Sequence, residues 1–292
     1  MSHVDEIKEL DALVRLMDEP NEAMFVEIRD KVLSYGKQAI PLLEEAWVNT
    51  MGDDDSERIE GIIDEIRQNE LLNEFTKWIE DSDNEIITGL IIISKYFQPE
   101  FDDDYYIASF NKLYREIWLE LNDNLTALEK IKVINHVLYG VYKFSSEPSN
   151  IVKSDTFFIN KVLDTKKGNS LSIGILYIAM AQKLGIPIFG VNLTSHFVLG
   201  YMDDFIDPKL PYEYTEDDAL FYLNPANIGA IFTHNEISNY LLQAKISSKP
   251  EYFLPCSNLT VIRRLINELI LSFEKENRHS KTIALSRLLT IF

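Results

Sequence analysis

Cysteine is almost absent from this sequence of 292 residues, because Cys256 is the only one. A single thiol excludes an intramolecular disulfide and any metal site built from several cysteines. Long apolar runs are missing as well: the stretches at residues 86–94 and 171–181 fall far short of the roughly 20 residues that a membrane-spanning helix needs. The first ten residues also lack the basic and apolar regions of a secretory signal. We therefore expect a cytoplasmic protein with no membrane partner.

Basic residues are scarce, since 28 Lys and Arg stand against 47 Asp and Glu and leave a formal net charge of −19. The imbalance lies in the first half: residues 1–130 hold 32 acidic and 12 basic residues, whereas residues 131–292 hold 15 and 16. Such a charge excludes a basic nucleic-acid-binding domain as the main function, so we expect no nucleic-acid partner. A solvated helical surface explains the acidic half. The alternative is a docking face for a protein or peptide partner of basic character.

Metal ligands are sparse in the sequence. The aspartate clusters at residues 53–55 and 102–104 lack the spaced ligands and the glycine of a calcium loop. The histidines at positions 3, 136, 234 and 279 are scattered along the chain and suggest no ligand set. We therefore expect no metal and no cofactor.

The first 145 residues show the three- and four-residue apolar spacing of helices, and β-branched alternation is almost absent. Residues 28–43 resemble a helical hairpin of the HEAT type, although one unit does not establish a solenoid. We predict a helical N-terminal domain at residues 1–145. Its expected helices lie at 11–17, 23–34, 39–48, 57–69, 70–80, 85–96, 105–121 and 125–143.

The pattern changes after Phe144. A loop at 145–150 and a short helix at 156–163 lead to a strongly apolar helix at 171–184, which Gly185 and Pro187 end. The sequence predicts an α+β fold, with a core domain at 146–246 and a C-terminal helical hairpin of the tetratricopeptide kind at 251–292. The elements expected around the apolar helix are antiparallel strands at 188–192, 196–201 and 219–223, a helix at 235–243 and two final helices at 259–275 and 280–291.

A polar residue at the start of a buried helix and a histidine on a nearby strand form a pattern with chemical meaning. Ser170 precedes the apolar helix, and His196 opens the second strand. Papain-like cysteine enzymes and transglutaminases share this arrangement. In them the helix N-terminus lowers the pKa of a thiol, the histidine takes its proton, and a third polar residue orients the imidazole.

Seven short motifs identify a family when they are taken together. They are Asn160-Lys161-Val162-Leu163, Lys167-Gly168-Asn169, LSIGILY at 171–177, Leu184-Gly185-Ile186-Pro187, GVNL at 190–193, His196-Phe197 and Asn224-Pro225. With them the chain resembles the transglutaminase-like proteins of the SirB-one family over most of residues 10–235, and the middle domain of certain F-box-only proteins is similar. The resemblance implies a helical N-terminal region followed by a transglutaminase-like α+β core.

The resemblance also implies a set of site residues. Ser170 stands where active members carry the nucleophilic cysteine, and His196 matches the histidine. The third position has two candidates, Asn224 in Phe-Tyr-Leu-Asn-Pro and Asp207 in Phe-Ile-Asp-Pro. We favour Asn224, because Asp207 lies only eleven residues after His196 and leaves little room for a full hairpin.

The missing cysteine decides the functional hypothesis. A serine hydroxyl is far less acidic than a thiol and needs a well-aligned base. We therefore expect a non-catalytic protein that binds a protein or peptide, with Ser170 as a helix N-cap and His196 in a structural role. The alternative is a hydrolase or acyl-transfer enzyme for amide or ester bonds that uses Ser170, His196 and either Asn224 or Asp207.

Two further residues have simple interpretations. A structural role for His196 is preferred to the alternative of a metal site with Asp203, Asp204 or Asp207. Cys256 follows the predicted linker at 247–250, and we expect a half-buried structural thiol.

Overall fold

The computed structural model describes residues 3–49, 53–81, 84–98, 100–147, 153–194, 196–203, 215 and 218–292. The chain divides into two compact units, Met1–Lys77 (unit 1) and Trp78–Phe292 (unit 2). Several helices that precede residue 145 therefore belong to the same unit as the sheet. The three domains at 1–145, 146–246 and 251–292 stay predictions.

Unit 1 is helical in its described residues. Asn21 caps the second helix, because its Oδ1 accepts hydrogen bonds from the N–H groups of Ala23 and Met24. Val32 and Leu43 are fully buried in the apolar core that the helices share. The elements are α1 (His3–Val14), α2 (Glu22–Ser34), the 3-10 helix η1 (Gly36–Ala39), α3 (Ile40–Asn49) and most of α4 (Asp53–Glu80).

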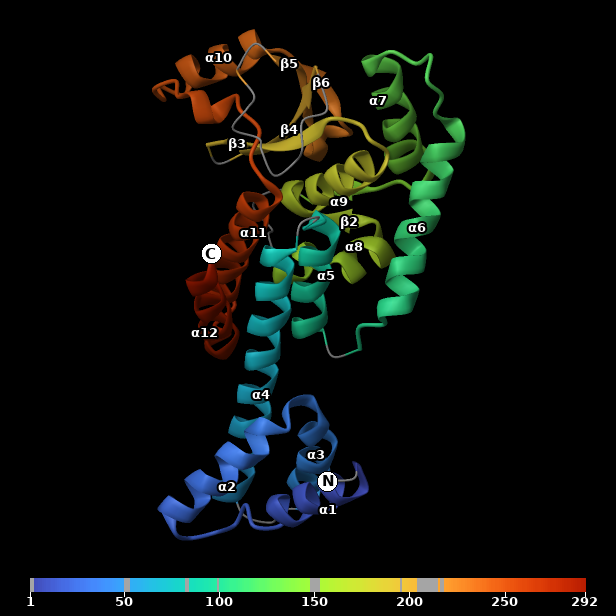
Figure 1. Ribbon diagram of the computed structural model, residues 1–292. Coiled ribbons are helices and arrows are strands. Elements are labelled where there is room, and N and C mark those ends of the chain that lie inside the picture. The colour runs from blue at the N-terminus through green and yellow to red at the C-terminus, as the bar shows by residue number, and fades with distance from the viewer. Residues whose placement is uncertain are drawn as a thin grey trace. The chain divides into compact units, whose positions relative to one another are not determined.

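Unit 2 combines helices with a small sheet, as Figure 1 shows. Its α-helices are α5 (Ile86–Phe97), α6 (Asp103–Glu120), α7 (Ala127–Asn135), α8 (Ile159–Thr165), α9 (Ser170–Lys183), α10 (His234–Gln243), α11 (Asn258–Lys275) and α12 (His279–Leu288). The shorter turns are the π-helix η2 (His136–Val141) and the 3-10 helices η4 (Ser154–Phe157), η7 (Pro225–Asn227), η8 (Pro250–Tyr252) and η9 (Leu289–Ile291).

Four antiparallel strands form the sheet of unit 2. Val191 pairs with Val198 across the first hairpin, and Leu199 pairs with Leu223 across the next strand pair. The predicted three-stranded antiparallel sheet is confirmed, and a fourth strand extends it. The order is β3 (Ile188–Leu193), β4 (His196–Met202), β5 (Ala219–Asn224) and β6 (Ala230–Phe232), while β1 (Ser145–Ser146) and β2 (Lys167–Gly168) form a separate parallel pair.

One face of the sheet packs against α10. Val191, Val198 and Tyr222 form an apolar cluster with Ile237 and Leu241 of that helix. Side chains alternate between the two faces of a strand, so the residues between these belong to the opposite face. The sheet therefore separates α10 from the elements that pack on its other side (Figure 1).

Phe197 fixes the packing of α9 against that other face. A Cβ atom built at Gly174 of α9 would lie 2.7 Å from the Phe197 ring, and one at Gly190 of β3 would also lie 2.7 Å from it. The ring fits because both neighbours are glycine. Residues 171–181 of α9 are all buried, as the apolar sequence predicts.

The helix predictions differ from the structure in several places. The predicted helix at 11–17 is the end of α1, which begins at His3 and ends at Val14, and the predicted helix at 280–291 is α12 followed by η9. The predicted helices at 57–69 and 70–80 form one continuous helix, α4, because no breaker separates them. The predicted helix at 125–143 is α7 followed by the π-helix η2, and the predicted helix at 156–163 is η4 followed by α8. The α+β class with helical N- and C-terminal regions is nevertheless confirmed. None of the described helices is long and apolar enough to cross a membrane.

Candidate functional site

Asn169 caps the N-terminus of α9. Its Oδ1 accepts hydrogen bonds from the N–H groups of Leu171 and Ser172, each at 2.9 Å. The Oγ of Ser172 accepts one from the Asn169 N–H at 3.0 Å, which completes a capping box. The interpretation of Ser170 as the N-cap is therefore wrong: the cap lies one residue earlier, and Ser170 is the first residue of the helix.

Thr156 of η4 joins this cap to the rest of the core. The Nδ2 of Asn169 donates to the Thr156 Oγ1 at 3.1 Å, and the Ser172 Oγ donates to the Thr156 carbonyl oxygen at 2.7 Å. Gly168 leaves the space for this contact, since a Cβ there would lie 2.5 Å from the Ser172 Oγ. Buried polar groups are costly unless they are paired, so this network fixes the start of α9.

Ser170 is the predicted equivalent of the nucleophile. It is half-buried at the first position of α9. Within the described residues its hydroxyl makes no hydrogen bond. The helix N-terminus favours an anion, but a hydroxyl without a base stays protonated at neutral pH.

His196 lies on the face of the sheet that α10 covers. The register pairs His196 with Leu193, and residues directly opposite each other share a face. Leu193 belongs to the apolar cluster against α10. The exposed imidazole of His196 meets the Tyr240 ring of α10 edge to face, with ring centroids 5.5 Å apart. Ser170 begins the helix on the other face, and no hydrogen bond joins these two described residues.

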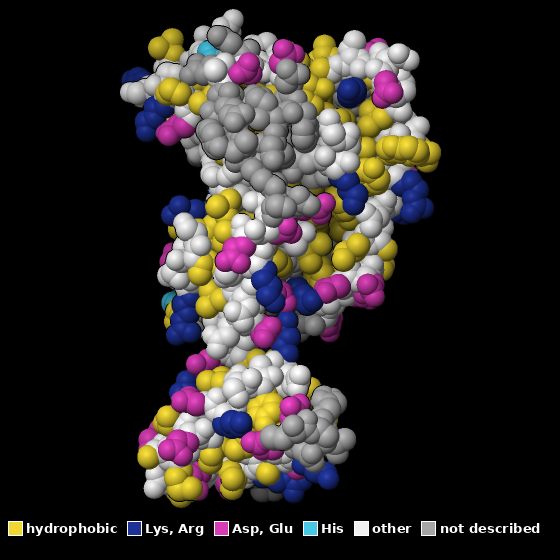
Figure 2. Space-filling view, viewed as in Figure 1, with side chains coloured by type: hydrophobic (Ala, Val, Ile, Leu, Met, Phe, Trp, Pro, Cys, Tyr) yellow, Lys and Arg dark blue, Asp and Glu magenta, His cyan; other side chains and the backbone are white. Residues whose placement is uncertain are grey.

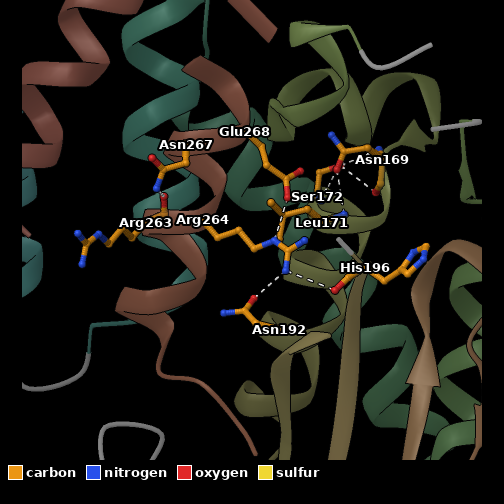
Figure 3. A network of polar contacts seen from close by, with 9 residues as sticks. All are labelled: Asn169, Leu171, Ser172, Asn192, His196, Arg263, Arg264, Asn267 and Glu268. Atoms are coloured by element: carbon orange, nitrogen blue, oxygen red, sulfur yellow. Dashed lines mark hydrogen bonds and ion pairs between the residues drawn. The ribbon is translucent and has the colours of Figure 1, made fainter. Parts of the chain in front are cut away.

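Arg264 of α11 holds the hairpin that carries His196 (Figure 3). Its Nη1 donates to the Asn192 Oδ1 at 2.9 Å and to the His196 carbonyl oxygen at 3.3 Å. Its Nε pairs with the Glu268 Oε1 at 2.8 Å, and its guanidinium lies 5.6 Å from the centre of the Phe197 ring. In Figure 3 the carbonyl oxygen of His196 points toward Arg264, while its imidazole points the opposite way.

Sequence reasoning missed Arg264, although one signal was present. The residue lies between Val261 and Leu265, both fully buried, on an amphipathic helix. A cation on the inner side of such a helix requires a partner. The partner Asn192 lies 72 residues away, so the sequence pattern does not identify it.

Asn224 ends β5 and closes a tight turn. Its Oδ1 accepts a hydrogen bond from the Ala226 N–H at 3.0 Å, and its carbonyl oxygen accepts one from the Gly229 N–H at 3.0 Å. The carboxamide oxygen, which the triad hypothesis assigns to the imidazole, therefore stabilises its own turn.

Polar side chains of α7, η2 and α9 hold the turn that follows β5. The Nδ2 of Asn135 donates to the Gly229 carbonyl oxygen at 3.1 Å, and its Oδ1 accepts from the Tyr177 hydroxyl at 3.0 Å. The Tyr139 hydroxyl donates to the Pro225 carbonyl oxygen at 3.1 Å. Burial raises the pKa of Tyr177 well above its ordinary value, so the phenol stays neutral and donates.

Of the remaining acidic candidates, Asp203 alone lies among the described residues. Asp207, the second candidate for the third position, lies outside the described residues, and so does Asp204. Asp203 follows β4 and is exposed. In the part of the chain that the structure describes, no three His, Cys, Asp or Glu side chains gather as metal ligands.

Cys256 lies beside β3 and is partly buried, as predicted. Its N–H and its thiol both donate to the carbonyl oxygen of Gly190, at 2.8 and 3.0 Å. Burial raises the pKa of the thiol to about 12, although the nearby Arg264 acts in the opposite direction. The thiol is therefore protonated at neutral pH and is a poor nucleophile.

The three described members of the predicted triad thus have separate surroundings. Ser170 has no hydrogen-bond partner among the described residues, His196 packs on Tyr240, and Asn224 stabilises a turn. Their catalytic assignment stays a prediction.

Comparisons with known proteins agree with the fold. A family model described as the transglutaminase-like superfamily matches residues 104–267. The UPF0162 protein of Vibrio cholerae is 24 % identical over 211 residues, which cover 71 % of this chain and 73 % of that protein. The UPF0162 protein YchA of Escherichia coli is 22 % identical over 208 residues, 70 % of this chain and 72 % of that protein. Mouse F-box only protein 21 is 22 % identical over 158 residues, 46 % of this chain and 25 % of that protein. No solved structure matches the chain.

Proposed function

We propose a binding function for this chain, which belongs to the transglutaminase-like superfamily. It keeps the scaffold of the superfamily without acyl-transfer chemistry and binds a protein or peptide partner. Within the superfamily we assign it to the SirB-one type, on the motifs Leu184–Pro187 and His196-Phe197. The observation that carries the proposal is the placement of Ser170 and His196 on opposite faces of the sheet.

Two chemical arguments support the absence of acyl transfer. The reaction needs an activated nucleophile within hydrogen-bond reach of its base. Ser170 has a hydroxyl where a thiol is required, and the His196 ring lies against Tyr240. Cys256 offers no replacement, because its thiol has a pKa of about 12 and donates to a backbone carbonyl.

The surface of unit 1 supports a partner of basic character. Residues 1–77 contain 20 acidic and 8 basic residues, a net charge of −12. Large apolar side chains are exposed among these charges, including Met24, Trp47 and Val48. Figure 2 shows carboxylates beside hydrophobic side chains on the visible face of helices α1 to α3. Exposed apolar residues rimmed by polar ones are typical of protein-binding surfaces, and the net negative charge of unit 1 favours a basic partner.

One observation favours the alternative of a serine hydrolase. The Ser170 hydroxyl has no hydrogen-bond partner in the described part of the chain and lies in the first turn of α9, although the N–H groups of Leu171 and Ser172 already donate to the Asn169 Oδ1. A fluorophosphonate probe separates the two hypotheses. We expect no labelling of Ser170 in the purified protein and no turnover of ester, amide or glutamine-bearing peptide substrates. Labelling that disappears in Ser170→Ala and falls in His196→Ala would establish the hydrolase instead.

The binding function is tested by affinity capture from the native host with mass spectrometry. A triple variant of unit 1, Glu27→Gln/Glu60→Gln/Asp64→Asn, removes three exposed carboxylates. The matched control in unit 2, Glu120→Gln/Asp123→Asn/Glu274→Gln, removes the same number. We expect a partner that is retained by the wild type and the control but lost by the unit 1 variant. Equal retention by all three proteins contradicts a contribution of these three carboxylates to partner binding.

A further inference from the structure

Unit 1 contains a groove that could hold the partner of the proposed function. The inference drawn from this groove rests on that proposed function. Its volume is about 620 Å³, and it lies between α4 and the segment formed by the end of α2 and η1. The carboxamides of Gln38, Asn69 and Asn73 line it. All three residues are exposed, and within the described chain none of these side chains makes a hydrogen bond. The groove therefore presents donors and acceptors that the fold itself does not use.

The chemistry of a carboxamide matches that of a peptide bond. Its NH₂ group donates and its oxygen accepts, so it can pair with the C=O and the N–H of a backbone. Asn69 and Asn73 are four residues apart on α4, which places them on one face of the helix about 6 Å apart. Alternate residues of an extended peptide repeat at about 6.6 Å. The two asparagines thus fit two successive peptide units on one edge of an extended segment.

The charges at the groove select the side chains of such a segment. Lys37 and Glu70 line the groove, and Lys37 pairs with Glu70 at 3.1 Å and with Glu74, which lies next to the lining residue Asn73, at 2.7 Å. Two carboxylates against one ammonium leave an excess of negative charge, and unit 1 as a whole carries a net −12. Cationic side chains are therefore attracted to the groove and anionic ones are repelled.

We infer that this groove binds an extended segment of a partner protein that carries Lys or Arg. Asn69 and Asn73 hold the backbone of the segment, and Glu70, with Glu74 beside the groove, attracts its cationic side chains. Neither asparagine is needed for the fold, because alanine is the better helix former at an exposed helical position.

The test measures peptide binding to the full chain by fluorescence anisotropy. Three labelled and capped nonapeptides are compared, in which serine alternates with lysine, with glutamate or with glutamine. We expect the lysine peptide to bind and the glutamate peptide not to bind. The variant Asn69→Ala/Asn73→Ala weakens binding by at least about tenfold, since it removes several backbone hydrogen bonds. The control Asn49→Ala, an exposed position outside the groove, leaves the affinity unchanged.

A second variant tests the charge selection. Glu70→Gln/Glu74→Gln removes both carboxylates and releases Lys37, so it weakens binding of the lysine peptide about tenfold and reduces the salt dependence. Circular dichroism confirms that each variant is folded. Three results would overturn the inference. They are unchanged affinity in Asn69→Ala/Asn73→Ala, equal binding of all three peptides, and no binding at a peptide concentration of about 1 mM. Failure of the proposed function gives a different result, namely turnover that depends on Ser170.

Discussion

Arg264 donates to the carboxamide of Asn192 at 2.9 Å, and this bond joins the C-terminal hairpin to the strand before His196. The same guanidinium reaches the His196 carbonyl oxygen and lies over the Phe197 ring. One side chain of α11 therefore positions the β3–β4 hairpin. Helix α11 thus contributes to the predicted site through the hairpin that carries His196, and not through the start of α9 that carries Ser170.

Arg264→Ala is expected to destabilise the fold by about 2–3 kcal/mol, because it removes charge-assisted hydrogen bonds and leaves Asn192 without its partner. The measurement is urea unfolding followed by circular dichroism. Arg263→Ala is the matched control, since Arg263 is the exposed neighbour on the same helix, and its change should stay within about 0.5 kcal/mol. Equal stability of the two variants would show that the contacts of Arg264 contribute nothing.

Gly174→Ala is expected to cost about 1–3 kcal/mol, because the added Cβ would lie 2.7 Å from the Phe197 ring. Gly61 in α4 provides the contrast, since a Cβ there meets no atom within 4 Å. Gly61→Ala should therefore stabilise unit 1 by roughly 0.5–1 kcal/mol through helix propensity. Hydrogen exchange with mass spectrometry measures both effects separately, because the peptides around Gly174 and those around Gly61 report on the stability of different units. Destabilisation by Gly61→Ala or tolerance of Gly174→Ala would contradict this packing.

Asn135→Ala is expected to cost about 2–4 kcal/mol, since it leaves the buried Tyr177 hydroxyl and the Gly229 carbonyl oxygen unpaired. Tyr177→Phe removes the orphaned hydroxyl. The double variant should therefore lose about 1 kcal/mol less than the sum of the two single variants. Denaturant unfolding of the four proteins gives this coupling energy directly. Strict additivity would mean that the hydrogen bond between the two side chains is not formed.

The lowered pKa of Glu276 predicts that the free energy of unfolding depends on pH. Burial by itself would raise its pKa, but hydrogen bonds from the N–H and hydroxyl of Ser154 and the charges of Arg278 and Lys281 outweigh it and lower the pKa below 4.5. A carboxylate with a lowered folded-state pKa stabilises the protein above its unfolded pKa, and this stabilisation is lost as the pH falls through the folded value. Glu276→Gln should thus be about 1 kcal/mol less stable than wild type at pH 7.

The difference for Glu276→Gln should shrink progressively below pH 4.5. Thermal unfolding at pH 3, 4, 5 and 7 measures it. Glu274→Gln is the control, because Glu274 is exposed in the last turn of α11, two residues before Glu276. A constant difference across this pH range would assign the effect to packing rather than to ionisation.

Local patterns were sufficient to predict most elements of the fold. The apolar helix ended by Gly185 and Pro187 and the strands around His196 need only neighbouring residues to define them, and the structure has both. The strand β6 was missed because its three residues are too few for an alternating pattern. The cap of α9 was misplaced by one residue, because asparagine and serine are adjacent and both are good N-caps.

The candidate site was harder to predict, for a physical reason. A motif aligns residues along the chain, but the face on which a strand side chain lies depends on the register of the sheet. The register turns the His196 ring toward Tyr240 and away from α9. The groove with Asn69 and Asn73 also escaped the sequence analysis, because exposed asparagines on a helix have no distinctive pattern until an opposing segment forms a wall.

Glu276 and Arg264 bear on the order of events during synthesis. Both lie in α11 or just after it, and they bind Ser154 and Asn192, which leave the ribosome much earlier. In a nascent chain that ends before α11, Arg264 is absent and Asn192 of the sheet lacks its hydrogen bond. Glu276 is absent as well, and Ser154 of η4 lacks its carboxylate acceptor. Unit 1, whose described ion pairs join residues within its own 77 positions, has no such requirement. Translation should therefore release a folded first unit while the second still awaits its last helices.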